Sequence, residues 1–542
     1  MNRITRFIVA GVVLLCAASL VFATGTNEEA GDEAGASAEI GFNETGMPIV
    51  DEKVTINVAA IDFWNTPDFN DKLMAQDWEE KTNVHIEWQH LPGGNDQAQM
   101  VNIMFASGDL PDAFFAASAA TERAFEYGGQ GLVLPLEDLV ATYAPNIQDV
   151  FEEVPAARRR GTAPDGHLYR IQHVDQTGRS DITGHQLINT DWLDAVGMDV
   201  PTTTDELYEV LSAFKTQDPN GNGEADEIPL TGLWGGYGTD NLGYLFGAFD
   251  AAPAQGMLYV DDATKEVRAG VLQPGYVDAM EYFHRLYDEG LIDVEVLVHD
   301  NTAIRAKTNS SPFRVGSFLT WRGWNHLGSL EAARTHYTLL EPLQGPSGDR
   351  NWRRQTSGVG WPASMITSEA EYPEVIIRWI DHNFISANGI QWLRGPFGTN
   401  IEERDDGRWQ LAPTPDEYER YGAFRTAHTF VFAPGAVVGS WVEDNWVIDE
   451  RVRAKNEAIE MYLPYADSWA IESVSTLTPA EQEEITTYFS DIETFAQNKE
   501  AEWLTEGGVR EEYDEFVDQL ERMNINRIVE LYQAGVDRYF GQ

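Results

Sequence analysis

Residues 54–63, VTINVAAIDF, are mostly apolar and β-branched, a pattern that predicts a buried strand. A helical pattern follows over residues 69–81, and VHIEWQHL (84–91) predicts a second strand. A further helix near residues 96–106 and a strand at about 112–115 continue the alternation. Strands that alternate with helices of this length indicate βαβ units and a parallel sheet covered by helices on both faces.

A second α/β region begins near His185, where HQLINTDWLDAVG predicts a strand and then a helix. Thr203 and Glu206 have the spacing of a capping box, and apolar residues then recur with a helical period. Another helix is expected over residues 275–289, followed by a strand in RVGSFLTWRGW (314–324). Amphipathic helices are expected between residues 513 and 532. No internal repeat accompanies these elements.

At 542 residues the chain is too long for one compact core, so two α/β lobes are expected. We predict that residues 51–175 with 313–400 form the first lobe, and 176–312 with 401–542 the second. The hinges are expected near residues 169–175, near residues 312–316 and beyond Thr399. Ligands of open α/β sheets bind at the carboxyl ends of strands, so a cleft between the lobes is the expected binding site.

The chain is strongly acidic, with 88 Asp and Glu against 37 Lys and Arg and a formal net charge of −51. Such a charge excludes a general nucleic-acid binder, because the phosphate backbone repels it. Lysine occurs at only eight positions, and this scarcity beside many carboxylates suggests a protein that works in concentrated salt. The alternative is an ordinary acidic, soluble protein. The single cysteine, Cys16, excludes a disulfide framework and a cysteine-based zinc site.

The N-terminus has the pattern of a secretory signal. Arg3 and Arg6 precede an almost wholly apolar run over residues 7–23, and Val21 and Ala23 suit a cleavage site before Thr24. We therefore predict a signal peptide over residues 1–23 and an exported protein, in the periplasm or at the outer face of the cytoplasmic membrane. Lipidation of Cys16 is the alternative, although Leu15 stands where lipoprotein signals have a small residue. Residues 24–50 are expected to be a flexible linker.

The sharpest motif is DPNGNGEADE (218–227). Oxygen-bearing side chains occupy positions 1, 3, 5 and 9, and glycine occupies position 6, as in a calcium loop of EF-hand type. Position 12 is proline, so Glu227 at position 10 is the expected substitute for the usual bidentate glutamate. The predicted ligands of a structural Ca²⁺ are Asp218, Asn220, Asn222, Glu224 through its backbone carbonyl, Asp226 and Glu227. A metal-free Asp/Asn/Gly-rich turn is the alternative.

Motifs for catalysis are missing from the sequence: it contains no H-E-x-x-H, G-x-S-x-G, Walker loop or G-x-G-x-x-G. We therefore predict that the protein is not an enzyme. Aromatic faces stack on sugar rings, and several aromatic residues stand where predicted strands end. The candidate ligand-binding residues, with an arginine that lies between two of them, are Trp64, Trp234, Tyr237, Trp321, Arg322, Trp324 and Trp361. Each tryptophan could equally plug a lobe interface.

The sequence resembles the family-1 extracellular solute-binding proteins, in particular the large lipoprotein-like branch that serves ABC-type carbohydrate importers. The resemblance is carried by WEEKTNVHIEW (78–88), MFASGDLPDAFF (104–115), LVLPLEDLVATYAPNI (132–147) and the long stretch 192–232, and it extends to the C-terminal helices. It implies a type II-like periplasmic-binding-protein fold, with two lobes, hinge strands and an interlobe ligand cleft. Relatives that bind acidic oligosaccharides carry calcium in a loop of the same pattern. The family has no fixed motif of sugar-contacting residues.

The resemblance implies a monomeric binding protein that captures an oligosaccharide or sugar-like solute by hinge closure and delivers it to the membrane subunits of an ABC permease. Two alternatives from other classes are a secreted polysaccharide-degrading enzyme and a surface or sensory glycan-binding module without a transporter. The sequence does not identify the sugar, and it does not say whether the ligand is charged.

The excess of carboxylates leads to a prediction about salt. Near 1 M salt the Debye length falls to roughly 3 Å, so repulsion among the surface carboxylates should be screened. We expect Tm to rise markedly between 0.05 M and 2 M KCl when unfolding is followed by calorimetry. A Tm that hardly changed would contradict adaptation to concentrated salt.

Overall fold

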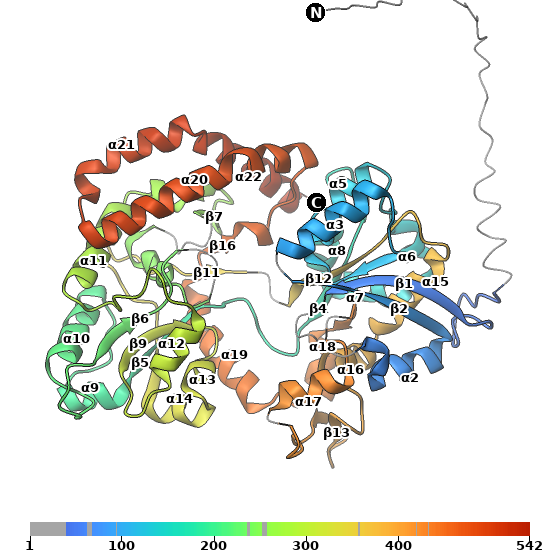
Figure 1. The fold of residues 1–542 in the computed structure, drawn as a ribbon, viewed down its shortest axis with the longest axis horizontal. Coiled ribbons are helices and arrows are strands. Elements are labelled where there is room, and N and C mark those ends of the chain that lie inside the picture. Colours follow the sequence, from blue (N-terminus) through green and yellow to red (C-terminus); the bar gives the residue numbers. More distant parts are fainter. Residues whose placement is uncertain are drawn as a thin grey trace, which may run out of the picture.

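The computed structural model describes residues 40–61, 68–93, 95–235, 239–251, 257–355, 358–418, 420–431 and 433–541. Its two α/β bodies lie side by side in Figure 1, with the C-terminal helices covering one end of the second body. The predicted signal peptide and residues 24–39 of the predicted linker fall outside the described residues, as do Trp64 and Tyr237. Residues 40–50 were expected to be flexible, but Ile49 and Val50 are fully buried in the core of the first body, so the linker prediction is wrong for this part. No helix within the described ranges is both long enough and apolar enough to cross a membrane.

A six-stranded sheet forms the centre of the first body, in the order β15-β4-β12-β3-β1-β2. Its strands are β1 (Val54–Ile61), β2 (Val84–Leu91), β3 (Ala113–Phe115), β4 (Ile171–Asp175), β12 (Val359–Ile366) and β15 (Ala436–Val437). β1 is parallel to β2 and β3, whereas β12 is antiparallel to β3 and β4, so β4 runs in the same direction as β1. The predicted strand–helix alternation is confirmed here, with α2 (Leu73–Thr82) and α3 (Asn95–Ser107) as the helices.

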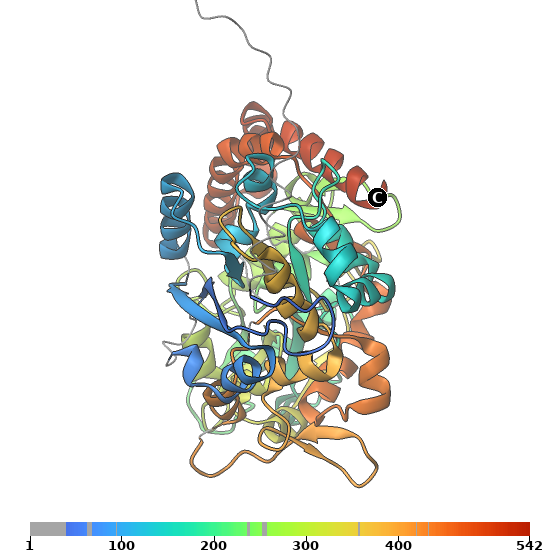
Figure 2. The ribbon, with the colours of Figure 1, turned by 90° about the vertical axis from the view of Figure 1, so that its right-hand side faces the viewer.

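Helices cover both sides of this sheet, as Figures 1 and 2 show. They are α4 (Ser118–Thr121), α5 (Ala124–Gly129), α6 (Glu137–Tyr143), α7 (Pro145–Glu153), α8 (Pro155–Gly161), α15 (Pro373–Asn383), α16 (Ser386–Arg394), α17 (Tyr421–His428) and α18 (Gly439–Asn445). Three buried tryptophans, Trp78, Trp379 and Trp392, meet in the core. The indole N–H groups of Trp78 and Trp392 both donate to the side-chain oxygen of buried Asn383, so these large side chains bury no unpaired donor there.

The second body contains two four-stranded sheets, ordered β10-β5-β9-β6 and β11-β16-β7-β8. The first comprises β5 (His185–Asn189), β6 (Ile228–Thr231), β9 (Val315–Thr320) and β10 (Tyr337–Leu340); the second comprises β7 (Leu258–Asp261), β8 (Val267–Ala269), β11 (Arg353–Arg354) and β16 (Ser468–Ala470). Its helices are α9 (Thr190–Val196), α10 (Thr204–Thr216), α11 (Tyr276–Asp288), α12 (Asn301–Thr308), α13 (Gly323–Leu327), α14 (Leu330–His336), α19 (Glu450–Tyr462), α20 (Pro479–Glu506), α21 (Val509–Arg522) and α22 (Ile525–Gly541). The capping box of Thr203 and Glu206 opens α10 as predicted.

Some strands that we predicted for the first lobe belong to the second body. β9 and β10 were expected there, within 313–400, but both pair with β5 in the second body. Conversely, Ile401 and Val437–Trp446 were expected in the second lobe, yet they pack with Ile390 and Leu393 of α16. The apolar pattern of 314–324 identifies a strand without identifying its partner, because strand pairing depends on contacts far along the chain. The predicted lobe boundaries at residues 313 and 400 are therefore wrong.

Three segments connect the bodies: residues 176–184, the stretch between β11 and β12, and the stretch between α18 and α19. The first connects the carboxyl end of β4 to the start of β5. Because β5 is antiparallel to β9, its first residue, His185, pairs with Thr320 at the carboxyl end of β9. The carboxyl-end edges of the two main sheets are thus joined directly by a short segment, and the side chains at these edges lie where the bodies meet.

In the second body, the backbone just before α11 lies in close contact with the end of a 3₁₀ helix. Gly275 precedes α11, and a Cβ added there would lie 1.4 Å from the carbonyl oxygen of Phe249. Phe249 ends the 3₁₀ helix η2 (Leu242–Phe249), which packs against α11 through Phe246 and Phe283. Only glycine allows η2 and α11 to approach this closely.

We expect Gly275→Ala to lower the free energy of unfolding by about 1–3 kcal/mol, since the added methyl group must push the two segments apart. Gly129→Ala is the matched control, because nothing lies within 4 Å of its added Cβ and its φ is ordinary for a helix. Urea denaturation measures both variants. Equal stability of Gly275→Ala and wild type would contradict the proposed steric constraint.

Candidate functional site

The junction between the bodies places several polar side chains at strand ends. Asp175 ends β4, His173 lies two residues before it, and Trp321 and Arg322 follow β9 directly. His185 pairs with Thr320 across the β5–β9 ladder, so it adjoins Trp321. The sequence predicted Trp321 and Arg322 as site residues from their position after a strand, and the structure places them at the junction.

Trp321 is half-buried and contacts two cations. The guanidinium carbon of Arg322 lies 4.2 Å from the centre of its ring, and Nζ of Lys455 on α19 lies 5.4 Å from it. Its indole nitrogen is buried without a hydrogen-bond partner in the described part of the chain. A ligand with hydroxyl or carboxylate oxygens would satisfy this donor.

Two more arginines reach the junction from the first body. Arg394, the last residue of α16, donates to Oγ1 of Thr177 at 2.6 Å and lies 3.7 Å from the carboxylate of Asp175. Arg425 on α17 makes only a long contact of 3.4 Å with the carbonyl oxygen of Leu393, among the described residues. Its Nε is buried and has no partner within the described ranges. The sequence analysis did not predict Arg394, Arg425, Lys455 or Asp175 as site residues.

Burial and mutual repulsion shift the pKa values of the charged side chains at the junction. Burial, reinforced by the charges of Arg322 and Arg394, lowers the pKa of Lys455 to about 8. Burial, with the charge of Arg394, lowers the pKa of Arg425 to about 10 and also lowers the pKa of Arg322. The pKa of Asp175 lies below its usual value although burial opposes this, because Arg394 and Thr177 favour the carboxylate. The cations on the two bodies therefore repel one another across the junction.

Unpaired polar atoms are concentrated in this part of the molecule. His185 is buried with neither ring nitrogen hydrogen-bonded inside the described ranges, and burial lowers its pKa to about 4. Nδ1 of His173 and Nε of Arg322 are likewise buried without a partner in the structure as described. An unpaired buried donor costs roughly 1–3 kcal/mol, so groups that gather in this way indicate a place where a polar ligand supplies the missing partners.

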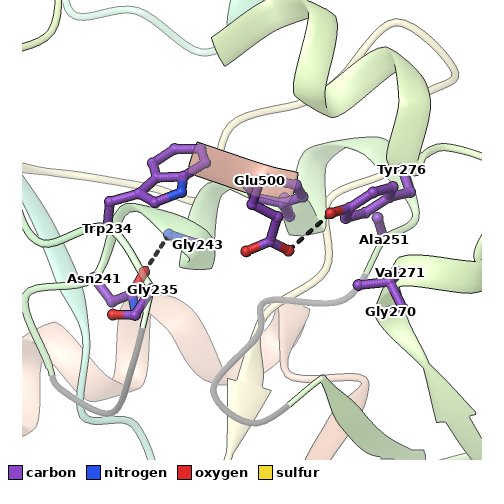
Figure 3. A pocket seen from close by; sticks show the side chains of 10 residues that line it. Trp234, Gly235, Asn241, Gly243, Ala251, Gly270, Val271, Tyr276 and Glu500 are labelled. Atoms are coloured by element: carbon purple, nitrogen blue, oxygen red, sulfur yellow. Dashed lines mark hydrogen bonds between the residues drawn. The ribbon is translucent and has the colours of Figure 1, made fainter. Parts of the chain in front are cut away.

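Trp234 lies elsewhere, in a smaller site within the second body (Figure 3). It packs edge-on against Phe283 and lines a cavity of about 40 Å³ together with Tyr276 and Glu500. Tyr276 donates a hydrogen bond of 2.8 Å to Glu500, and burial raises the pKa of Glu500 to about 7. The indole nitrogen of Trp234 is buried and unpaired within the described ranges. Trp234 is thus partly a core residue.

The remaining aromatic candidates have different positions. Trp324 lies on α13, partly exposed and three residues beyond Trp321. Trp361 lies within β12, near the end of that strand that pairs with the carboxyl end of β4. Trp64 and Tyr237 lie outside the described residues. The structure therefore brings Trp321 and Arg322 into one cluster and places Trp234 apart from it.

The predicted calcium loop connects α10 to β6, and its side chains turn inward. The amide nitrogens of Asn220 and Asn222 each donate to one carboxylate oxygen of Asp226 at 3.0 Å. The carboxylate of Asp218 accepts hydrogen bonds from the backbone N–H groups of Asn222 and Gly223. The side chain of Glu224 is exposed, as expected of a residue that would offer its backbone carbonyl.

Glu227 shows that these residues fit a hard cation. It is only 5% exposed, and its Oε1 is buried without a hydrogen-bond partner in the described chain. Burial, together with the nearby carboxylates of Asp226 and Asp218, raises the pKa of Glu227. A buried, unpaired carboxylate beside two others, all from one loop, is a donor set of the kind that Ca²⁺ takes.

Asp293, Glu295 and His299 form a second group with metal-ligand chemistry. However, Nζ of Lys307 lies 2.6 Å from carboxylate oxygens of both Asp293 and Glu295 and 3.3 Å from Nδ1 of His299. Nε2 of His299 donates to the carbonyl oxygen of Gly232, which leaves Nδ1 to accept from the lysine. The ammonium group thus occupies the position that a metal ion would need.

Comparison with known proteins agrees with this architecture. Residues 65–310 match the family of bacterial extracellular solute-binding proteins. The chain is 30% identical to the fructooligosaccharide ABC transporter substrate-binding protein FusA of Streptococcus pneumoniae serotype 4, over 99% of both chains. It is 29% identical to the lipoprotein LipO of Bacillus subtilis, over 59% of this chain and 62% of that protein.

Solved structures show the same fold. FusA in complex with kestose superposes with a TM-score of 0.78 at 28% identity, over 90% of this chain and all of that one. An EF-hand mutant of FusA in complex with fructo-nystose gives a TM-score of 0.77 at the same identity. A human-milk-oligosaccharide-binding protein of Bifidobacterium longum infantis shares the fold, with a TM-score of 0.75 at 23% identity.

FusA is a substrate-binding protein of an ABC transporter, and the two-lobed α/β fold that the sequence predicted is confirmed. With near-complete coverage at 30% identity, the chain belongs to the family of bacterial extracellular solute-binding proteins.

Proposed function

We propose that this protein is the substrate-binding component of an ABC importer, that it captures an oligosaccharide between its two bodies, and that it delivers this ligand unchanged to the permease. The observation that carries the proposal is the group of buried, unpaired donors around Trp321 at the junction of the bodies. The import role and the sugar class are supported by the similarity to FusA, which binds fructooligosaccharides. The protein would act as a monomer outside the cytoplasm, in the periplasm or at the outer face of the cytoplasmic membrane.

Capture would occur by closure of the two lobes. We assign residues 40–175 and 359–446 to one lobe and residues 185–340 and 450–541 to the other, from the strand pairings and cores. The three connecting segments are then the hinges. A ligand bound first to one lobe would gain contacts with the other on closure, and only such a differential gain can drive the motion.

Trp321 would provide the apolar face on which a sugar ring stacks, while Arg322 and the unpaired donors would bind hydroxyl oxygens. Trp64, Tyr237, Trp324 and Trp361 remain proposed contacts. Trp234 would have a lesser part in binding, because it packs on Phe283 inside the second body.

Calcium binding is part of the proposal. Asp218, Asn220, Asn222, Asp226 and Glu227 would hold Ca²⁺ through side-chain oxygens, and Glu224 through its carbonyl. The support is the buried, unpaired Oε1 of Glu227, together with the EF-hand of FusA, whose sequence is similar to this chain. The ion would fix the connection between α10 and β6, so its role is structural.

We expect Trp321→Ala to weaken oligosaccharide binding at least tenfold, about 1.4 kcal/mol, with little change in the Tm of the ligand-free protein. Trp234→Ala is the comparison, and it should lower the unfolding free energy by about 2–4 kcal/mol because its ring packs on a core phenylalanine. Isothermal titration against a panel of neutral and acidic oligosaccharides, followed by calorimetry, measures both quantities. If Trp321→Ala destabilised the protein without changing affinity, Trp321 would be a core residue only.

We expect removal of calcium to lower Tm, and a saturating return of Ca²⁺ to restore it. At 100 times Kd the stabilisation would be about 2.7 kcal/mol. Glu227→Gln should lose most of this calcium-dependent shift, because it removes the charge of a buried ligand. Glu331→Gln, on α14, is the control for the loss of one carboxylate. A calcium response that was identical in the two variants would contradict the assignment of Glu227.

A further inference from the structure

The chain has few cations, yet four of them converge on the junction. Arg322 and Lys455 come from the second body, and Arg394 and Arg425 come from the first. Lys455 is buried and the three arginines are half-buried. In a protein of net charge −51, such a local excess of positive charge is the reverse of what composition alone would produce. The opposing pairs belong to different bodies, so their separation changes when the bodies move.

The carboxylates near this cluster do not neutralise it. Asp175 is the nearest, 3.7 Å from Arg394, and it also accepts from the backbone N–H and the hydroxyl of Thr177. Asp181 is paired with Arg179 at 3.2 Å, and Asp449 caps the N-terminus of α19. Four cations therefore share one close carboxylate.

Lys455 is the most informative of the four. It is 8% exposed, and it makes no hydrogen bond or ion pair with the rest of the described chain. Its Nζ lies over the ring of Trp321. Buried lysines are ordinarily paired. Arg322 is similar: its guanidinium stacks on Trp321 and, within the described residues, pairs with no carboxylate. Two cations that contact the ring of Trp321 thus have no paired anion within the described residues.

We propose that the ligand of this site is an acidic oligosaccharide, whose carboxylate or sulfate group binds between Arg322 and Lys455 on one body and Arg394 and Arg425 on the other. This inference rests on the proposed function and specifies its substrate class. Guanidinium groups bind carboxylate and sulfate oxygens through paired hydrogen bonds, and Trp321 would stack on the ring that carries the acid. The bound anion would relieve the repulsion between the two pairs of cations, so that ligand charge and lobe closure are coupled.

The test compares sugars that differ only in charge. Trigalacturonate and its fully methyl-esterified form share the same rings, and a sulfated galactose trisaccharide with its desulfated partner forms a second pair. Titration calorimetry should show at least tenfold tighter binding of the acid than of its neutral partner in one of the two pairs. The pair that shows the preference identifies a carboxylate or a sulfate ligand. In small-angle scattering, the acidic sugar should reduce the radius of gyration of the protein, and its neutral partner should not.

Two variants locate the effect. Lys455→Met and Arg425→Gln, one on each body, should each remove most of the preference for the acid. Lys499→Met is the matched control, because Lys499 also stacks on a tryptophan, Trp503, but lies on α20 and pairs with Glu502 and Glu512. This control should retain the full preference.

The outcomes separate this inference from the proposed function. Equal binding of acid and neutral partner by the wild-type protein in both pairs would overturn the acidic ligand and leave oligosaccharide capture intact. A preference that survived in both junction variants would also overturn it, by placing the acid elsewhere. Binding of none of the four sugars by a protein that binds a neutral oligosaccharide of the wider panel would overturn the acidic ligand alone, whereas binding of no oligosaccharide in that panel would reject the proposed function as well. The wild-type comparison holds even if a variant fails to fold.

Discussion

The pairing of β5 with β9 is the contact on which the functional geometry depends. Because the two strands are antiparallel, the first residue of β5 lies beside the last residue of β9, and β5 is reached directly from the carboxyl end of β4. The chain thus leaves one sheet at the carboxyl ends of its parallel strands, where ligands of open α/β sheets bind, and enters the other at the corresponding edge. Asp175, His185, Trp321 and Arg322 owe their positions at the junction to this connection.

The junction also gathers groups that are costly to bury. A buried donor without a partner is costly, and a buried cation more so. At the junction such groups would be hydrated if the two bodies separated and admitted water. The body cores also hold unpaired polar atoms: the oxygen of Asn383 accepts from two tryptophans, yet its amide nitrogen has no partner within the described residues. The junction differs in that several of its unpaired groups are cations.

Local features of the fold could be predicted from the sequence, and long-range ones could not. The strand at 54–61, the helix that follows it and the capping box of Thr203 were all identifiable, because each depends on residues within one or two turns. The lobe that contains β9 was assigned wrongly, since its apolar pattern fits either sheet. The same limit applies to the site. Trp321 and Arg322 stand out after a strand, whereas Arg394, Arg425 and Lys455 are single basic residues on helices, and only tertiary structure brings them together.

The lysine between Asp293, Glu295 and His299 has a consequence for metal selectivity. An imidazole with two carboxylates is a typical donor set for transition metals such as zinc and copper. By placing its own ammonium group at the centre of this triad, the chain excludes those ions without giving up the acidic residues. Transition metals therefore find no ready-made site at this triad, in the same body that carries the predicted calcium loop (218–227).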